Sequence, residues 1–425
     1  MYKFDIGSHR RQCPPFLAIS SVAFLCLMQS SARADDDVDF PNWTFGGYGT
    51  AGAAYSSERQ ADYAANGLNP GGAGYTHRVS PAVDSRLGAQ LGISINNQWS
   101  ATLQLVSERN SQNSYRPAVE WANIKYQMTP DFSLRLGRIA LPIFLHGDYR
   151  KAAYALAWAR PPVEVYGALP LSSSDGIDAS YRWNALGVNN VTQAFFGHAA
   201  VKINDANTFA RARQITGLSN TTTRGALTVR ASAMTANLSI NLAQPLFDAF
   251  RQFGPQGEAL ATTYGADHKQ VVIGNIGVSY DTGNLFLMGE ASRFNARSFL
   301  GDKTAYYATA GYRFGTIAPY ITYARARSNG QTRDQGLDLA FLPPQAAPAA
   351  AYLNGQLNAL LRTIATQQTS SIGVRWDFMP NRAFKLQYDR VSPQGGSSGT
   401  LINVQPGFES GHPVHVLSAS LDFVF

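Results

Sequence analysis

Residues with the chemistry for catalysis or metal binding are few in this chain of 425 residues. Both cysteines, Cys13 and Cys26, lie in the first 34 residues, and the later histidines are scattered: His77, His146, His198, His268, His412 and His415. None of these histidines stands in a metal-ligand spacing. His412 and His415 lie close together, where pairing with a serine would suit a hydrolase, but a histidine without a catalytic role is the favoured interpretation. We expect no enzymatic activity, no metal and no cofactor.

Charged residues follow a second pattern, because they alternate with apolar residues along short segments. The basic members of the polar set are Arg86, Arg135, Arg182, Arg230, Arg313, Arg375 and Lys385. A charge that faces lipid at the bilayer midplane costs roughly 2–4 kcal/mol, so their restriction to one set indicates a lipid-facing and a lumen-facing side. The acidic members are Asp178, Asp377, Asp389 and Asp422. The slight cationic excess predicts weak anion preference or none.

The segments that carry these charges are predicted to be β-strands of about ten residues. In the last of them, Leu417, Ala419, Leu421, Phe423 and Phe425 alternate with small or polar residues, a period of two that is typical of barrel strands. Sixteen segments qualify: 43–55, 85–95, 99–106, 118–127, 132–138, 176–183, 190–199, 210–219, 225–238, 270–281, 285–294, 304–314, 319–327, 368–378, 383–391 and 414–425. Alternation is weak at 118–127, 210–219 and 285–294, which leaves 14 or 18 strands open.

The connections between these segments alternate in length, as in an outer-membrane barrel with short periplasmic turns and long external loops. Seven links of three to six residues alternate with eight longer ones, which places both termini in the periplasm. Within the long links, 245–253 and 351–362 could form short helices or could be loops packed over the mouth. The sequence thus predicts an all-β, transmembrane, antiparallel up-and-down barrel that occupies residues 35–425 as a single domain.

The first 34 residues have the three parts of a secretory signal. Arg10 and Arg11 precede an apolar run at 14–28, and Ala32-Arg33-Ala34 forms a small-residue cleavage site. Cleavage after Ala34 would remove four basic residues and one acidic residue, so the net charge would fall from +7 to +4. Such a charge does not indicate a nucleic-acid-binding protein.

Two motifs resemble proteobacterial outer-membrane porins. The final strand, which ends in Leu421, Phe423 and Phe425, resembles the signal by which the barrel assembly machinery recognises outer-membrane proteins. The segment at 139–175 contains Leu141-Pro142, Gly147-Asp148-Tyr149 and a run from Arg160 to Tyr166 that resemble the third external loop of these porins. In that family this loop folds into the lumen and narrows the pore.

The resemblance implies a set of constriction residues. Its loop members are Asp148, Arg150, Lys151, Arg160 and Glu164, and they would face Arg86, Arg135 and Arg182 on the wall. Opposed charges there would create a transverse field that orients dipolar solutes. The alternative is that these residues only tie the loop to the wall by salt bridges. Both interpretations are open.

Sixteen strands enclose a lumen wide enough for water. We therefore expect an outer-membrane porin for passive diffusion of small polar solutes and ions. A solute-selective porin for anions or carboxylates is the alternative, and an outer-membrane enzyme or a structural barrel is the alternative of another class. The resemblance also implies a homotrimer in contact with outer-membrane lipid and lipopolysaccharide, which the Gly- and Ala-rich first strand would permit.

Overall fold

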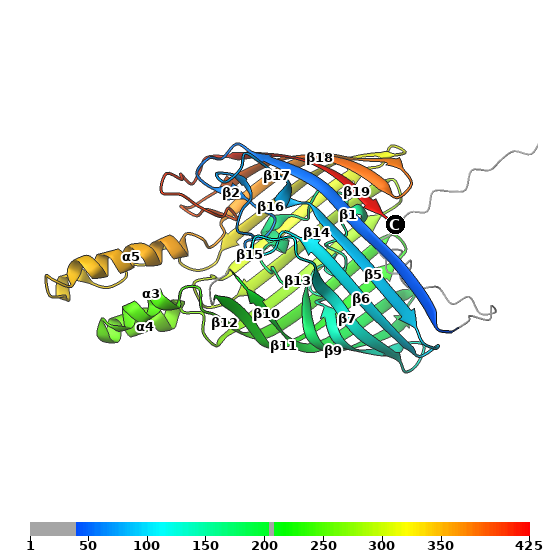
Figure 1. Cartoon of the computed structure of the whole chain (residues 1–425), viewed down its shortest axis with the longest axis horizontal. Coiled ribbons are helices and arrows are strands. Elements are labelled where there is room, and N and C mark those ends of the chain that lie inside the picture. The colour runs from blue at the N-terminus through cyan, green and yellow to red at the C-terminus, as the bar shows by residue number, and fades with distance from the viewer. Residues whose placement is uncertain (1–39, 204–207) are drawn as a thin grey trace, which may run out of the picture.

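The computed structural model describes residues 40–203 and 208–425. The secretory signal predicted for residues 1–34 lies outside the described residues. Sixteen long antiparallel strands form one closed, tilted barrel (Figure 1). They are β1 (Asn42–Ser56), β5 (Arg86–Ser94), β6 (Trp99–Glu108), β7 (Ala118–Gln127), β8 (Phe132–Ala140), β9 (Ser173–Ala185), β10 (Val188–Lys202), β11 (Phe209–Arg224), β12 (Leu227–Ile240), β13 (Lys269–Asp281), β14 (Leu285–Asn295), β15 (Lys303–Tyr312), β16 (Ile317–Ser328), β17 (Gln367–Met379), β18 (Arg382–Pro393) and β19 (Val414–Val424). The predicted strand number and fold class are confirmed.

The barrel closes where β1 pairs with both β5 and β19. Nine residues of β1, from Tyr48 to Ser56, are paired with the last strand, and the overlapping stretch from Asn42 to Thr50 is paired with β5. Closure satisfies the backbone groups that an open sheet edge would expose to lipid, which is the condition for strands to span a bilayer.

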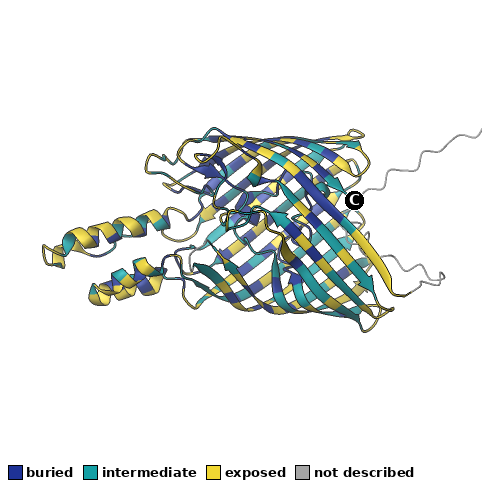
Figure 2. Ribbon diagram, viewed as in Figure 1, coloured by how far each residue is buried: buried dark blue, intermediate teal, exposed yellow. Residues whose placement is uncertain are grey.

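Burial alternates along the strands as the sequence predicts (Figure 2). On β19, Leu417 and Leu421 are exposed on the outer surface, whereas Ser418, Ser420 and Asp422 are buried inside. On β5, Leu87 and Leu91 are likewise exposed. The apolar set therefore faces outward and the polar set faces the lumen.

Some strand boundaries differ from the sequence prediction. β9, β10 and β11 extend beyond the predicted segments, so the turns predicted at 184–189 and 220–224 shrink to the residues around Leu186-Gly187 and Gly225-Ala226. These strand ends are polar, for example at Thr221, Thr222 and Thr223. Outside the apolar band, strand pairing continues without the hydrophobic alternation on which the prediction depended.

Two long connections form helices rather than irregular loops. The first contains α3 (Gln244–Arg251) and α4 (Gly254–Tyr264), and the second contains α5 (Ala347–Leu361). The helices project from the barrel at the end opposite the C-terminus (Figure 1) and share an apolar cluster that includes Phe247, Phe250 and Leu357. Among the described residues, no helix is long and apolar enough to cross a membrane.

Candidate functional site

The connection between β8 and β9 enters the barrel and lines its interior. Its ordered pieces are a 3-10 turn η2 (Ala153–Ala155) and one short helix α2 (Val163–Tyr166). Its apolar residues, among them Ile143, Trp158 and Val165, are fully or almost fully buried. A connection of this length and apolar content cannot remain in solvent without exposing that surface, and burial inside the lumen removes it from water.

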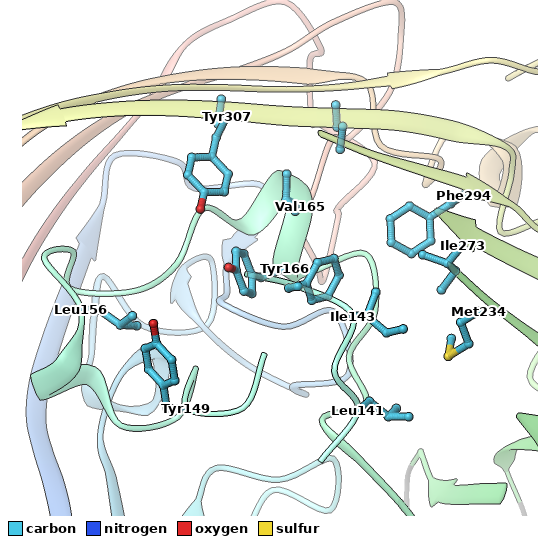
Figure 3. Packing of buried hydrophobic residues seen from close by; sticks show 14 of the residues in the cluster. Leu141, Ile143, Tyr149, Leu156, Val165, Tyr166, Met234, Ile273, Phe294 and Tyr307 are labelled. Atoms are coloured by element: carbon cyan, nitrogen blue, oxygen red, sulfur yellow. The ribbon is translucent and has the colours of Figure 1, made fainter. Parts of the chain in front are cut away.

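The wall that receives this loop is apolar, although the sequence predicted a polar lumen. Figure 3 shows Ile143 and Tyr166 of the loop beside Ile273, Phe294 and Tyr307 of the wall. Together the loop and the inner faces of β10–β16 form the largest hydrophobic cluster described. The sequence contained a signal for this arrangement. Alternation is weak on β14 because inward positions such as Phe286, at 2% exposure, are apolar and belong to this cluster instead of facing water.

Wall side chains bind the loop backbone directly. Lys385 donates to the carbonyls of Ala153 (2.6 Å) and Trp158 (2.9 Å), and Arg375 donates to those of Tyr154 and Leu156. Further bonds to the loop backbone come from Arg230, Ser232, Asn275, Glu290 and Gln387. Several basic residues that the sequence placed on the lumen-facing set are therefore used to hold the loop.

Glu290 of β14 is a carboxylate anchor that the sequence reasoning missed. It is 3% exposed and accepts hydrogen bonds from Tyr166, from Tyr307 (3.0 Å) and from the backbone N–H of Leu145 (2.8 Å). Asn275 donates to it as well, at 3.2 Å. Hydrogen-bonded in this way, the carboxylate joins two parts of the loop to the wall. The position of Glu290 among the apolar residues of β14 is the feature of the sequence from which this role could have been predicted.

Arg160 and Glu164 are two of the predicted site residues, and both are 2% exposed. Arg160 forms a bidentate pair with Asp84 (2.8 and 2.6 Å) and a longer contact to Asp389 at 3.3 Å. Burial alone would lower the pKa of the Arg160 guanidinium, but Asp84 raises it well above its usual value. Glu164 accepts from Gln367 at 2.6 Å and from Thr369, and burial raises its pKa. Both side chains tie the loop to the barrel.

Asp148 and Lys151 are less buried and lie at the edge of the loop. Asp148 pairs with Arg230 at 2.8 Å. Lys151 pairs with Glu108 of β6 at 2.6 Å and with Glu120 of β7 at 2.7 Å. Burial favours the neutral amine, but the two carboxylates prevail and raise the pKa of Lys151. The ammonium group therefore stays charged at neutral pH.

Open space remains between the loop and the β5–β8 side of the wall. A cavity of about 230 Å³ and a second of about 100 Å³ share Glu108, Arg109 and Lys151 in their linings. Arg86 and Arg150 line the smaller one. Arg86 lies 3.8 Å from Glu108, and Arg150 donates to the carbonyl of Leu169. The structure thus brings Arg86, Arg150 and Lys151 together beside the two glutamates.

Arg135 and Arg182 lie elsewhere, toward the short-turn end of β8 and β9. Arg135 is opposite Lys125 on one neighbouring strand and opposite Asp178 on the other, to which it donates at 3.0 Å. Lys125 was not singled out from the sequence, although it belongs to the same polar set. The predicted site residues therefore fall into three groups. Arg160, Glu164 and Asp148 bind the loop to the barrel wall, and Arg86, Arg150 and Lys151 line the smaller cavity. Arg135 and Arg182 belong to a separate basic cluster near the short turns.

His412 and His415, which the sequence places close together, have separate partners in the structure. His415 lies 2.6 Å from the Tyr388 hydroxyl and stacks on its ring, and His412 lies 3.3 Å from Glu409. Across residues 40–203 and 208–425, no group of three or more His, Cys, Asp or Glu side chains is arranged to hold a metal ion.

Comparison with known proteins identifies the architecture. The sequence matches no family model and no curated protein. Among solved structures, an anion-selective porin from Comamonas acidovorans aligns with a TM-score of 0.54 at 12% identity, over 90% of this chain and 99% of that one. Salmonella typhi OmpF in complex with daunomycin aligns with a TM-score of 0.52 at 12% identity, over 91% and 98% of the two chains. The fold is that of outer-membrane porins.

A third structure with the porin fold is the DcaP channel of Acinetobacter baumannii. It aligns with a TM-score of 0.52 at 11% identity, over 90% of this chain and 97% of that one. At this identity the likeness extends to the fold, and what passes through this barrel has to be argued from its own residues.

Proposed function

We propose that this protein is a porin of the outer membrane that lets small polar solutes and ions diffuse passively. The proposal depends on one observation: the lumen is divided into a side that is filled by the loop and a side where charged side chains border open space. On the β10–β18 side, the loop is held by an apolar cluster and by wall side chains that bind its backbone. On the β5–β9 side, charged side chains border open cavities. Solutes would pass along this charged side.

The charges on the open side support a modest preference for anions. Apart from the loop anchor Arg160, the basic residues are Arg86, Arg109, Lys125, Arg135, Arg138, Arg150, Lys151 and Arg182, whereas the acidic ones are Glu108, Glu120, Asp175 and Asp178. Eight cations face four carboxylates. A surplus of one sign in a narrow passage with low-dielectric walls raises the local concentration of counter-ions. The presence of both signs also suits dipolar solutes, so we assign a general pore rather than one dedicated to a single substrate.

The test is single-channel recording of the folded protein in a neutral planar bilayer, with the reversal potential measured across a salt gradient. We expect ohmic steps that scale with salt concentration and a reversal potential of the sign that reports anion preference. The double variant Lys125→Gln/Arg182→Gln should shift that potential toward cation selectivity. Arg325→Gln/Arg327→Gln, which removes the same charge from the outer surface of β16, should leave the potential unchanged.

Two outcomes would overturn the proposal. A folded barrel without conductance would instead be a structural barrel or an enzyme. Small steps that saturate with salt would point to a solute-specific channel. An unchanged reversal potential in the double variant would overturn the assigned path while leaving a pore.

We also propose a homotrimer of chains whose signal is removed after Ala34. The outward residues Ala51 and Ala53 of β1 are small and exposed, so a neighbouring wall could approach closely. Gly47 and Gly49 are already covered by the Phe425 and Phe423 rings of the same chain. Native mass spectrometry of detergent-purified protein should show three chains, and Ala53→Arg should give monomers. A monomeric wild type would contradict the trimer.

A further inference from the structure

The lumen-facing wall carries a basic cluster next to the short turns that join β7 to β8 and β9 to β10. The cluster consists of Lys125 on β7, Arg135 on β8 and Arg182 on β9. Lys125 is directly opposite Arg135, and the backbone N–H of Arg182 donates to the carbonyl of Asp131 in the first of those turns. Arg182 is exposed and the other two basic residues are half-buried. Because short turns are periplasmic in outer-membrane barrels, the cluster borders the periplasmic end of the charged path.

This basic cluster has more positive than negative charge. Its acidic side chain, Asp178, already accepts a hydrogen bond from Arg135 at 3.0 Å. In the described part of the chain, no ion pair joins Lys125 to a carboxylate. On the opposite side of the barrel, Arg313 has a carboxylate partner of its own, Asp281, at 2.8 Å. Three basic side chains with one carboxylate therefore attract a further anionic group.

An acidic segment precedes β1 in the sequence. Cleavage after Ala34, as proposed above, would leave Asp35-Asp36-Asp37-Val38-Asp39 at the start of the mature chain. These five residues lie outside the described residues. They carry four carboxylates and no basic side chain, and the new α-amino group adds one positive charge. At neutral pH the segment therefore has a net charge of 1 − 4 = −3, opposite in sign to the cluster.

The strand register places the start of β1 at the level of the basic cluster. Asn42, the first residue of β1, pairs with β5, and through β5 and β6 it shares one cross-strand row with Lys125 and Arg135. Figure 1 shows these strands side by side along one wall. The next residue, Trp43, is exposed on the outer surface, so Asn42 belongs to the set that faces the lumen. The chain therefore enters the wall at the same level as the cluster and on the same face.

The acidic segment is long enough to reach the cluster. Neighbouring strands lie about 4.8 Å apart, so Lys125 is about 14 Å from Asn42 along the wall and Arg135 is about 19 Å from it. An extended chain covers at most about 3.3–3.6 Å per residue. Asp39 can therefore lie about 10 Å from Asn42, and Asp35 can lie about 23 Å from it. These spans bracket the distances to both basic side chains.

We propose that the acidic segment 35–39 binds the basic cluster and partly covers the periplasmic end of the pore. Its carboxylates would accept charge-assisted hydrogen bonds from the ammonium and guanidinium groups. Because the segment is tethered, its effective concentration at the cluster is on the order of millimolar, so it competes with passing anions. The bound segment would lower both the current and the preference for anions. The inference rests on the proposed pore and on cleavage after Ala34.

The first experiment is single-channel recording of exported protein whose N-terminus has been verified by mass spectrometry. The variant Asp35→Asn/Asp36→Asn/Asp37→Asn/Asp39→Asn should show larger conductance steps than the wild type and a reversal potential shifted toward anion selectivity. Both differences should be clear in about 0.1 M salt and small in about 1 M salt, where screening is stronger. The matched control Asp248→Asn/Glu258→Gln/Asp267→Asn/Glu409→Gln removes four exposed carboxylates from the long connections and should behave as the wild type.

A double-mutant cycle tests whether the segment acts through the basic cluster. In a Lys125→Gln/Arg182→Gln background, the four asparagine substitutions should have little further effect on conductance or reversal potential. Full additivity of the two sets of substitutions would mean that the segment does not bind there.

Cross-linking tests the contact without relying on conduction. Both cysteines of the sequence precede Ala34, so the mature chain has none. Val38→Cys/Ser100→Cys keeps every charge and places one thiol in the segment and the other opposite Lys125. A disulfide should form under mild oxidation and become rarer in about 1 M salt. Val38→Cys/Ser279→Cys is the control, because Ser279 is a buried residue of β13 on the far side of the barrel.

Three results would overturn the proposal. One is an asparagine variant that conducts as the wild type does, another is an equal change in the matched control, and the third is cross-linking at Ser279 as efficient as at Ser100. A protein that does not conduct would remove the proposed pore, whereas the cross-link would still decide whether the segment binds the cluster. Failure of the inference and failure of the proposed function are therefore distinguishable.

Discussion

Gly47 and Phe425 close the barrel. The N–H of Gly47 donates to the Phe425 carbonyl at 2.8 Å, and the N–H of Phe425 donates to the Gly47 carbonyl at 3.0 Å. The Phe425 ring lies against Gly47, where an added Cβ would be 2.3 Å from the ring and 2.6 Å from the carbonyl oxygen of Gly88. The first strand therefore needs glycine at this position so that the terminal aromatic ring can lie across it.

We predict that Gly47→Val will weaken barrel closure. The new side chain would be wedged between a ring and a backbone carbonyl, and overpacking of this kind costs about 1–3 kcal/mol. The midpoint of urea unfolding, measured by heat-dependent migration on gels, should fall. Gly274→Val on β13 is the control, because a Cβ there meets no atom within 4 Å. Equal midpoints for the two variants would contradict this account of closure.

The sequence predicted the barrel well because a lipid-facing wall imposes a strict pattern. Apolar residues such as Leu417 and Leu421 must recur at every second position, and a charge among them would cost several kcal/mol. No comparable rule fixes strand ends outside the apolar band, which is why β9–β11 are longer than predicted. The sequence left short helices open at 245–253 and 351–362, where α3 and α5 form, but it did not predict α4 or the contact between the two distant loops, which leaves little trace in either local sequence.

A second prediction concerns the buried ion pair of the loop. Arg160→Met would leave Asp84 and Asp389 buried without their cation, and breaking a buried pair in this way costs about 3–5 kcal/mol. The free energy of unfolding should fall accordingly, and the single-channel current should become noisier as the loop loosens.

Two comparisons isolate the role of that pair. Adding Asp84→Asn to Arg160→Met should recover part of the stability, since one uncompensated charge is removed. Arg251→Met breaks exposed pairs with Asp248 on α3 and Glu258 on α4 and should change the free energy of unfolding by less than about 1 kcal/mol. A similar small effect for Arg160→Met would show that the loop does not depend on this contact.

A third prediction is a dependence of stability on pH through His146. Its Nδ1 lies 2.6 Å from the Tyr149 hydroxyl, and burial lowers its pKa to about 3, with Arg230 nearby contributing. In the unfolded chain a histidine has a pKa near 6.5. Between these values the unfolded state binds the extra proton, so stability should fall as the pH is lowered from about 6.5 toward 3.

The measurement is urea unfolding of the wild type and of His146→Phe over that pH range. Phenylalanine keeps the ring that packs edge-on against Trp158 but cannot be protonated. The variant should therefore lose less stability between pH 6.5 and pH 4 than the wild type. If the two proteins lost stability in parallel, His146 would take up its proton in the folded barrel at about the same pH as in the unfolded chain.

The functional site was less predictable than the fold. The type of a charged residue that faces the lumen does not show whether its side chain binds the loop or pairs with another charge on the wall. Lys385 and Arg375 belong to the same polar set as Arg135, yet the first two bind loop carbonyls and the third faces Asp178. Only the path of the loop decides between these roles. That path depends on tertiary contacts such as that of Trp158 with Thr309 and Thr322, which are more than 150 residues away in the sequence.

The last prediction is that Lys151 contributes to the preference of the pore for anions over cations. Its ammonium group lies between Glu108 and Glu120, and Lys151→Gln would leave both carboxylates facing the cavity without it. One unit charge at about 4 Å in water corresponds to about 1 kcal/mol, so the ratio of anion to cation permeability should fall roughly three- to fivefold. Because the carboxylates raise the pKa of Lys151, the wild-type ratio should not change through this residue between pH 6 and pH 9. Arg327→Gln controls for net charge, and a reversal potential that is the same in wild type and Lys151→Gln would show that ions pass elsewhere.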